Sequence, residues 1–220
     1  MSKPQLEAVL FDMDGVIADT MQYHYSAWRD ILKTMGVTLT EDEFRPLFGQ
    51  RHDNIIRYAL GNKMTYEEIE ALSNKKQALY RERVAKDIRP LPGAIELIES
   101  LKKNHIKTAL ASSATPENVD IIMRGLGIGD RFQAYVNGPE VAEGKPSPLI
   151  FQLAAKKLGA PPSSCVVIED AIAGVTAAKD GGMKCVAVTN SHPRAKLKNA
   201  DLTVDSLVEV NIAVLKGLFD

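Results

Sequence analysis

The chain has 220 residues, of which 45% are hydrophobic and 25% charged, and its formal net charge is −1. Because 27 basic side chains nearly balance 28 acidic ones, the chain lacks the overall positive field that would hold a nucleic acid or an anionic membrane surface. No apolar run approaches the roughly 20 residues of a membrane-spanning helix, and residues 1–7 contain no apolar signal region. We therefore expect a globular, cytoplasmic protein with a substantial core and no nucleic-acid or membrane partner.

The first predicted element is a buried strand that ends in acidic residues. Ala8–Phe11 is a short apolar run, and Asp12 and Asp14 follow it, with Gly15 next to them. Because side chains alternate along a strand, both carboxylates leave its end on the same side. Two carboxylates about 4 Å apart repel by about 4 kcal/mol at an effective dielectric of about 20. The pair therefore predicts a site where a divalent cation and a phosphate group offset this repulsion.

The segment that follows shows helical patterning in place of strands. A helix is expected over Met21–Met35, with Trp28 and Met35 on its apolar side. Thr65 is the expected N-cap of a longer helix that runs to about Lys86.

Two prolines and a glycine in residues 88–93 interrupt any helix and mark a boundary. We therefore predict an all-helical cap domain, residues 20–89, inserted into a core domain formed by residues 1–19 and 90–220. Its two connections could serve as hinges, and we expect the insertion to act as a lid over the end of the first strand.

Beyond this boundary, apolar runs alternate with helical patterns. The runs that we interpret as strands are Thr108–Ala111, Ala134–Val136, Val166–Ile168, Cys185–Val188 and the weaker Leu202–Val204. The predicted fold class is therefore α/β, with a Rossmann-like, mostly parallel sheet and helices on both faces. Ligands of such sheets bind beyond the carboxyl ends of the strands. The two cysteines, Cys165 and Cys185, lie at the start of predicted strands, and we expect them to be small core residues.

Polar side chains also follow the later strands. Ser112 and Ser113 come after the second apolar run, Lys145 lies in a proline-containing loop, and Glu169 and Asp170 follow the fourth run. Hydroxyl and free backbone N–H groups at a strand-to-helix junction suit a phosphate dianion. Each motif alone also has a simpler interpretation: helix capping for the serines and the acidic pair, and a solvated surface position for the lysine.

Taken together, two acidic strand ends, a serine strand end and a loop lysine, in this order, resemble the haloacid dehalogenase superfamily of aspartate-nucleophile phosphotransferases. The resemblance covers essentially the whole chain. The helical insertion and the sequences of residues 14–20 and 169–183 resemble the β-phosphoglucomutase-like and phosphoglycolate phosphatase-like branch. Ala171 stands where that branch usually has a serine, a difference that leaves the expected metal ligands intact.

The resemblance implies roles for five core residues. Asp12 would be the nucleophile that attacks phosphorus and forms an aspartyl phosphate. Asp14 would be the general acid and base, which protonates the leaving oxygen and then activates the acceptor. Ser112 and the Ser113 amide would hold phosphoryl oxygens, and Lys145 would neutralise Asp12 and the transferring group.

The resemblance also implies a Mg²⁺ cofactor. The carboxylates of Asp12 and Asp170 and the backbone carbonyl of Asp14 would hold the ion, with Glu169 in or near its coordination shell. Hard oxygen ligands suit Mg²⁺, which also keeps waters and the substrate phosphate in its octahedron.

Substrate choice is expected to depend on four residues of the insertion. His24 and Lys76 occupy positions similar to those of β-phosphoglucomutase, although His24 could equally be a core histidine and Lys76 could extend along the apolar stripe to reach solvent. His52 stands where the mutase has an arginine that grips the second phosphate, and Arg51 comes one residue earlier. The mutase lysine that shortly follows the second-motif serine, here Ser112, has no counterpart.

A mutase must hold its substrate by both ends, whereas a phosphatase needs only one. We therefore expect a Mg²⁺-dependent phosphatase that acts on a small phosphorylated metabolite such as a sugar phosphate, and a monomer. β-Phosphoglucomutase activity is the alternative. A more remote alternative is a receiver-like switch, in which phosphorylated Asp12 changes binding to a partner, but the large helical insertion favours an enzyme.

Overall fold

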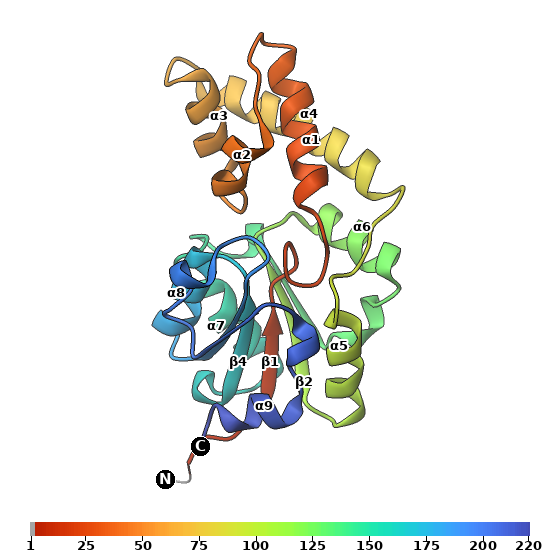
Figure 1. The fold of residues 1–220 in the computed structure, drawn as a ribbon, viewed down its shortest axis with the longest axis vertical. Coiled ribbons are helices and arrows are strands. Elements are labelled where there is room, and N and C mark those ends of the chain that lie inside the picture. Colours follow the sequence, from red (N-terminus) through yellow and green to blue (C-terminus); the bar gives the residue numbers. More distant parts are fainter. Residues whose placement is uncertain (1–2) are drawn as a thin grey trace. The chain divides into compact units, whose positions relative to one another are not determined.

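The computed structural model describes residues 3–220. Its tertiary contacts divide the chain into two compact units, one formed by the residues up to Asp19 together with Arg89–Asp220, and the other by Thr20–Ile88 (Figure 1). The larger unit, called the core below, holds the sheet, and the smaller unit, called the cap, is helical.

The core contains a six-stranded sheet in the order β3-β2-β1-β4-β5-β6, in which every neighbouring pair is parallel. The strands are β1 (Ala8–Phe11), β2 (Lys107–Ser112), β3 (Ala134–Asn137), β4 (Cys165–Glu169), β5 (Lys184–Val188) and β6 (Leu202–Val204). Each predicted strand is present within one residue at either end, and the predicted fold class is confirmed. The central strand β1 is apolar throughout because helices cover both faces of the sheet.

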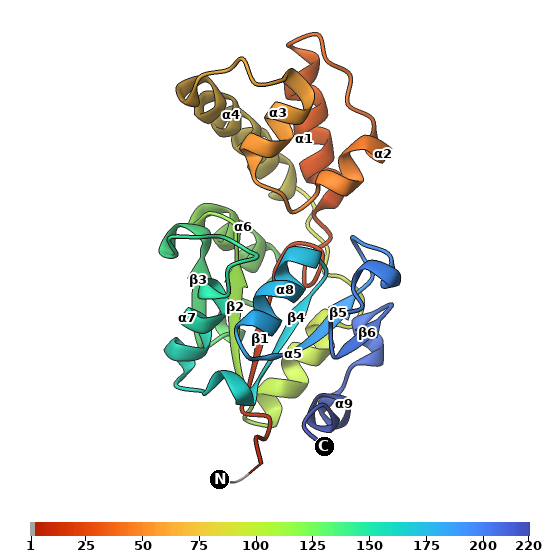
Figure 2. The ribbon, with the colours of Figure 1, turned by 90° about the vertical axis from the view of Figure 1, so that its left-hand side faces the viewer.

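Helices cover the sheet on its two faces. They are α5 (Ala94–Lys103), α6 (Pro116–Leu126), α7 (Leu149–Leu158), α8 (Ile172–Asp180) and the short α9 (Ile212–Gly217). Figure 2 shows α7 and α8 in front of the sheet and α5 behind it. Single 3-10 turns lie at Arg45–Leu47, Gly129–Arg131, Gly138–Glu140, Pro162–Ser164, Arg194–Lys196 and Leu207–Glu209.

The alternation of side chains along β1 explains how the core packs. Ala8 and Leu10 belong to the cluster of buried residues that also contains Phe151 of α7. Cys165 and Cys185 lie in the same cluster as free, buried thiols, so the expectation that they are small core residues is confirmed.

The cap consists of α1 (Met21–Lys33), α2 (Glu41–Phe44), α3 (His52–Leu60) and α4 (Tyr66–Val84), with its own apolar cluster. Thr65 caps α4 as predicted, because its side chain accepts a hydrogen bond from the Glu68 backbone N–H and the Glu68 side chain accepts one from Thr65.

Two details of the predicted cap helices were wrong. The helix predicted over Met21–Met35 ends at Lys33, and Met35 is 45% exposed, since Gly36 next to it takes the left-handed φ of +77° that turns the chain away. The long helix ends at Val84, before the predicted Lys86, where Ala85 forms the C-cap.

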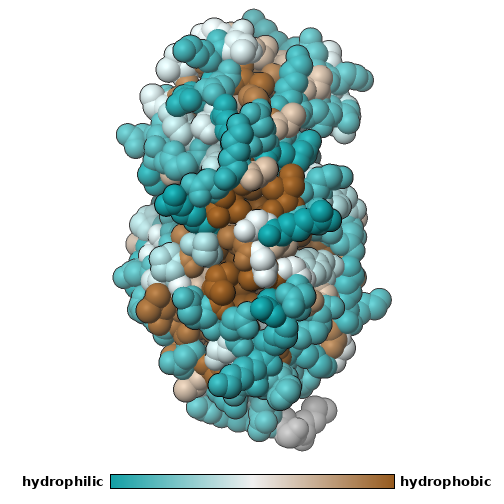
Figure 3. Space-filling view, turned by 90° about the vertical axis from the view of Figure 1, so that its right-hand side faces the viewer, coloured by the Kyte–Doolittle hydropathy of each residue, from teal (hydrophilic) through white to brown (hydrophobic). Residues whose placement is uncertain are grey.

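On the face drawn in Figure 3, hydrophilic residues cover most of the surface and hydrophobic residues form smaller patches between them. Within residues 3–220, none of the helices combines the length and the apolar character needed to cross a membrane.

Candidate active site

Strand register brings the acidic residues together at the carboxyl ends of β1 and β4. Phe11 of β1 pairs with Ile168 of β4, and the Asp12 backbone N–H donates to the Ile168 carbonyl at 3.0 Å. Asp12 and Glu169 are each the next residue along their strand, so they lie side by side, and Asp170 follows. The parallel sheet therefore gathers carboxylates that are far apart in the sequence.

The three carboxylates form one buried cluster. Asp12, Glu169 and Asp170 are only 7%, 1% and 2% exposed, and each offers an oxygen within 4.8 Å of the others. This all-oxygen donor set fits a hard divalent cation such as Mg²⁺. Asp14 lies two residues beyond Asp12, is half-buried, and forms an isolated parallel bridge with Ala18.

Lys145 reaches into the same cluster from the loop before α7. Its Nζ lies 2.6 Å from Asp12 Oδ1 and 2.5 Å from Glu169 Oε1, and also 4.9 Å from the centre of the Phe151 ring. The side chain is only 10% exposed, so the interpretation of Lys145 as a solvated surface lysine does not hold.

The charges in this cluster do not balance. Burial raises the pKa of Asp12 to about 7, although the Lys145 ammonium acts in the opposite direction. Burial, followed by the nearby Glu169 carboxylate, also raises the pKa of Asp170 well above its ordinary value. Burial by itself would lower the pKa of Lys145, but Asp12 and Glu169 outweigh it and raise that pKa. One ammonium thus faces three carboxylates, a deficit of positive charge that a divalent cation would remove.

Two glycines allow the backbone to approach the carboxylates closely. Gly15 has a φ of +78°, and a Cβ there would lie 1.9 Å from Asp170 Oδ2. A Cβ on Gly174 in α8 would lie 1.8 Å from Glu169 Oε1. Glu169 Oε2 in turn accepts hydrogen bonds from the backbone N–H groups of Asp170 and Ala171, both at 2.8 Å.

The serine motif lies at the end of β2, the other neighbour of β1 in the sheet. Ser112 is 1% exposed and its Oγ accepts a hydrogen bond from the Ala114 backbone N–H at 3.1 Å, while Ser113 is exposed. Thr115 is the N-cap of α6, which begins at Pro116, but the Thr115 side chain makes no capping hydrogen bond. Helix capping by these side chains therefore does not account for the motif.

The cap holds a second cluster of predicted residues. The Lys76 Nζ lies 2.6 Å from Nδ1 of His24, whose ring stacks on Tyr80 at a centroid distance of 4.0 Å. Lys76 is completely buried, with its Nζ 4.9 Å from the centre of the Tyr80 ring and 5.6 Å from that of Trp28. Lys76 therefore does not extend to solvent, and the apolar stripe on α4 includes a buried charge.

His52 and Arg51 differ sharply in their surroundings. The His52 ring meets Trp28 edge-on at 5.2 Å, and burial, with the nearby Lys76 charge, lowers the pKa of His52 to about 3. The Arg51 side chain is 81% exposed, and its Nε lies 3.1 Å from Asp53 on the surface. The structure thus groups His52 with the His24 and Lys76 cluster and leaves Arg51 outside it.

The model of the haloacid dehalogenase-like hydrolases matches residues 9–188. The chain belongs to this family. It is an enzyme of the kind predicted, since its relatives in the family are phosphatases and mutases.

Individual relatives support the same placement. The chain is 36% identical over 218 residues to "Beta-phosphoglucomutase" of Bacillus subtilis (96% of this chain, 94% of that protein) and 34% identical over 183 residues to "Phosphorylated carbohydrates phosphatase" of Thermotoga maritima (81% and 83%). The structure of β-phosphoglucomutase from Clostridium difficile superposes with a TM-score of 0.86, at 31% identity over 97% of each chain. Another relative is "Protein SUPPRESSOR OF QUENCHING 1, chloroplastic" of Arabidopsis thaliana, which is 37% identical over 204 residues, or 89% of this chain. The match covers only 19% of the length of that protein.

Sequence reasoning missed the loop after β5. Asn190 donates a hydrogen bond to the Gly15 carbonyl at 2.8 Å, and Ser191 donates one to the Asp170 carboxylate. The signal that marked the other motifs, polar side chains directly after a predicted strand, was present here as well in the sequence that follows Val188.

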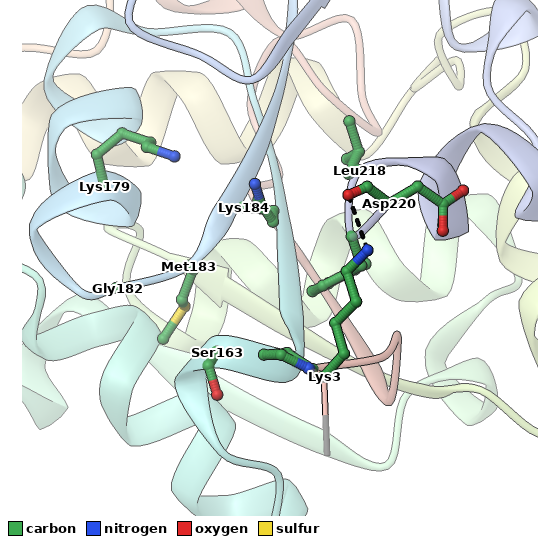
Figure 4. Close-up of a pocket in the computed structure, with 10 residues that line it drawn as sticks. Lys3, Ser163, Lys179, Gly182, Met183, Lys184, Leu218 and Asp220 are labelled. Atoms are coloured by element: carbon green, nitrogen blue, oxygen red, sulfur yellow. Dashed lines mark hydrogen bonds between the residues drawn. The ribbon is translucent and has the colours of Figure 1, made fainter. Parts of the chain in front are cut away.

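The structure also has a cavity of about 440 Å³ that is unrelated to the acidic cluster. Its walls include Ser163, which precedes β4, and Lys184, which begins β5 (Figure 4). Lys3 also borders it, with its Nζ 2.9 Å from the Asp220 backbone carbonyl oxygen. The cavity therefore lies at the amino ends of the strands, at the opposite edge of the sheet from Asp12.

Proposed function

We propose that this member of the haloacid dehalogenase-like family is a Mg²⁺-dependent phosphatase that acts on a small phosphorylated metabolite, specifically a sugar phosphate, through an aspartyl phosphate on Asp12. The observation that carries the proposal is the position of Asp12. It directly follows the central strand β1, shares a buried cluster with Glu169 and Asp170, and is held by Lys145 at 2.6 Å. This position fixes the direction from which the Asp12 carboxylate can attack phosphorus, and Lys145 supplies a positive charge beside the phosphoryl group that Asp12 receives.

The proposed reaction has two steps. In the first, an Asp12 carboxylate oxygen attacks phosphorus, the bond from phosphorus to the ester oxygen breaks, and Asp14 gives its proton to the leaving sugar hydroxyl. In the second, water attacks the phosphorus of the aspartyl phosphate, Asp14 takes the proton from this water, and inorganic phosphate leaves with the carboxylate of Asp12 restored.

The surrounding residues stabilise the charge of the transferring group. Lys145 neutralises Asp12 and the phosphoryl oxygens, while the Ser112 hydroxyl and the Ser113 amide hold those oxygens in place. Asp12, Asp170 and the Asp14 backbone carbonyl would hold Mg²⁺, with Glu169 beside them. When bound, the ion supplies the positive charge that the buried carboxylates lack and polarises the phosphoryl group.

Two features support a phosphorylated carbohydrate as the substrate. The names of two relatives, a β-phosphoglucomutase and a phosphatase of phosphorylated carbohydrates, both refer to such compounds. The cap, in addition, contains a buried polar cluster of Lys76, His24 and His52, whose hydrogen-bonding groups would suit the hydroxyls of a sugar.

β-Phosphoglucomutase activity is the second candidate, favoured by 36% identity to that enzyme over 96% of the chain. The cap gives it less support. A mutase needs a cation for the second phosphate, whereas His52, with a pKa of about 3, is neutral at pH 7. Arg51, the neighbouring cation, lies on the surface beside Asp53.

A pair of assays separates the two candidates. We expect Mg²⁺-dependent release of inorganic phosphate from a panel of sugar phosphates to exceed conversion of β-glucose 1-phosphate to glucose 6-phosphate in the presence of a bisphosphate primer. The opposite ranking would replace the phosphatase with the mutase. Asp12→Asn should abolish both activities, and Asp120→Asn, at an exposed position on α6, is the matched control.

We propose a monomer in the cytoplasm, to be checked by sedimentation and by localisation of the native protein. A stable phosphate on Asp12 that alters partner binding without multiple turnover would instead support the receiver-like switch.

A further inference from the structure

The loop between β5 and β6 contacts both segments that supply the carboxylates. The Asn190 side-chain amide donates to the Gly15 carbonyl at 2.8 Å, and the Ser191 hydroxyl donates to the carboxylate of Asp170. Gly15 belongs to the turn that carries Asp12, and Asp170 follows β4. Two adjacent residues of a single loop thus hold the β1 turn and the end of β4 together.

The contact between Gly15 and Asp170 is tight. A Cβ on Gly15 would lie 1.9 Å from Asp170 Oδ2 and 3.0 Å from Ser191 Oγ, so the glycine, the carboxylate and the hydroxyl meet at one point. A shift of the turn that follows β1 would therefore also displace the Asp170 carboxylate.

A carboxylate that binds a cation through one oxygen needs a hydrogen-bond donor for the other, and such outer partners orient the ligand. Asp170 is 2% exposed, so the protein has to supply this donor in place of bulk water. Ala171, the next residue, has no polar side-chain atom. The Ser191 hydroxyl supplies this donor from the loop that follows β5, the strand next to β4.

The loop is itself anchored to β6 and the residue after it. The Thr189 backbone N–H donates to the Val204 carbonyl at 3.0 Å, and its hydroxyl donates to Asp205 Oδ1 at 2.9 Å. Arg194, on the other side of Ser191, donates to the same Asp205 oxygen at 2.8 Å. Because both sides of the loop are tied to one segment, the loop holds Asn190 and Ser191 in a defined position.

We infer that Asn190 and Ser191 are positioning residues for the metal site. Ser191 orients the Asp170 carboxylate, and Asn190 holds the Gly15 carbonyl and with it the turn after Asp12, so that together they set the separation of the two carboxylates. The inference rests on the proposed function in one respect, namely that the cluster takes Mg²⁺.

The test measures Mg²⁺ affinity of the full chain by isothermal titration calorimetry, without substrate. We expect Ser191→Ala to weaken Mg²⁺ binding by about 10- to 100-fold, the effect typical of removing an outer hydrogen-bond partner, and Ser191→Thr, which keeps the hydroxyl, to recover most of the loss. Ser163→Ala, at an exposed position at the opposite edge of the sheet, is the matched control and should bind as the wild type does. Asn190→Ala should give a smaller loss, since it acts on the turn and not on a ligand.

A second measurement distinguishes positioning from general damage. In phosphate-release assays, Ser191→Ala should need more Mg²⁺ for half-maximal rate, while kcat at saturating Mg²⁺ and the KM for substrate stay close to the wild-type values. Equal Mg²⁺ affinity of Ser191→Ala and Ser163→Ala would overturn the inference, as would equal losses in Ser191→Ala and Ser191→Thr. A wild type that binds Mg²⁺ without hydrolysing phosphate esters would refute the proposed function and leave this inference standing. A wild type that does not bind Mg²⁺ would refute both.

Discussion

The core and the cap each bury charged side chains, but they place them by different means. In the core, Asp12 directly follows β1 and Glu169 ends the paired strand β4, so the backbone register fixes their separation. In the cap, Lys76 meets His24 at 2.6 Å only because α1 and α4 pack together through their side chains. A site defined by strand ends is rigid and tolerates little change, whereas a site built from packed helices can be altered one residue at a time. This difference agrees with the proposed function, in which the core carries out phosphoryl transfer and the cap selects the substrate.

The largest effect is expected for loss of the ammonium in the core. Lys145→Met leaves the buried carboxylates of Asp12 and Glu169 without their partner, and removing one side of such a pair costs about 3 to 5 kcal/mol of unfolding free energy. Activity should fall by about 10²- to 10³-fold, as on removal of one transition-state contact. Urea unfolding in EDTA and phosphate-release assays measure the two effects.

The control for this change is Lys156→Met, at an exposed position on α7, which should lie within about 0.5 kcal/mol of the wild type. If both variants are equally stable, the core cluster does not depend on Lys145.

Removal of the metal should have the next largest effect. Mg²⁺ at 100 times its dissociation constant is expected to stabilise the wild type by about 2.7 kcal/mol. Asp170→Asn should lose most of this gain because it removes a ligand, yet in EDTA it should be more stable than the wild type, because one uncompensated buried charge has gone. Urea unfolding with and without Mg²⁺ tests both statements, and an equal gain in the variant would argue against the proposed ligand.

The cap should show its own pH dependence through His52. Its pKa falls from 6.5 to about 3 on folding, so between these values the unfolded chain binds a proton that the folded chain does not. The contribution of the neutral His52 ring to the free energy of unfolding is therefore fully present above pH 6.5. As the pH falls from 6.5 to about 3, this contribution decreases by at most about 1.4 kcal/mol per pH unit. The charges near this ring are Lys76, His24 and Asp53.

The measurement is urea unfolding at pH 7 and pH 5. His52→Gln should flatten the fall in stability, whereas His105→Gln, an exposed histidine of the core, should leave it unchanged. An identical fall in all three proteins would remove His52 as its cause.

The smallest effect is expected for Lys76→Met, and it should be selective. Replacement of the buried ammonium by an apolar chain of similar length should raise the KM for a sugar phosphate about tenfold, equivalent to about 1.4 kcal/mol. Hydrolysis of p-nitrophenyl phosphate, which has no sugar hydroxyls, should change little. Lys75→Met, at the adjacent exposed position, is the control, and equal effects on both substrates would show that Lys76 has no part in selectivity.

The contrast between the two units also explains what could be predicted from the sequence. Strands were predictable because a run such as Ala8–Phe11 has to be buried on both faces, and parallel pairing then places Asp12 beside Glu169 at one edge. The contact of Lys76 with His24 could not be predicted, because a helical stripe shows which residues face inward but not which partner each one meets. Ser191 follows a predicted strand closely, as the other site residues do, but its contact with Asp170 depends on the path of a loop, which the neighbouring residues alone do not determine.

The account rests on phosphorylation of Asp12, and trapping this phosphate tests it most directly. Asp14→Asn should slow hydrolysis of the aspartyl phosphate, so that the intermediate accumulates when the protein reacts with p-nitrophenyl phosphate and Mg²⁺, because the nitrophenolate leaving group needs no proton from Asp14. Borohydride reduces an acyl phosphate to an alcohol, which mass spectrometry locates in the chain. We predict the reduced residue at position 12, only when Mg²⁺ is present. A label at another residue, or turnover by Asp12→Asn at the wild-type rate, would contradict the account.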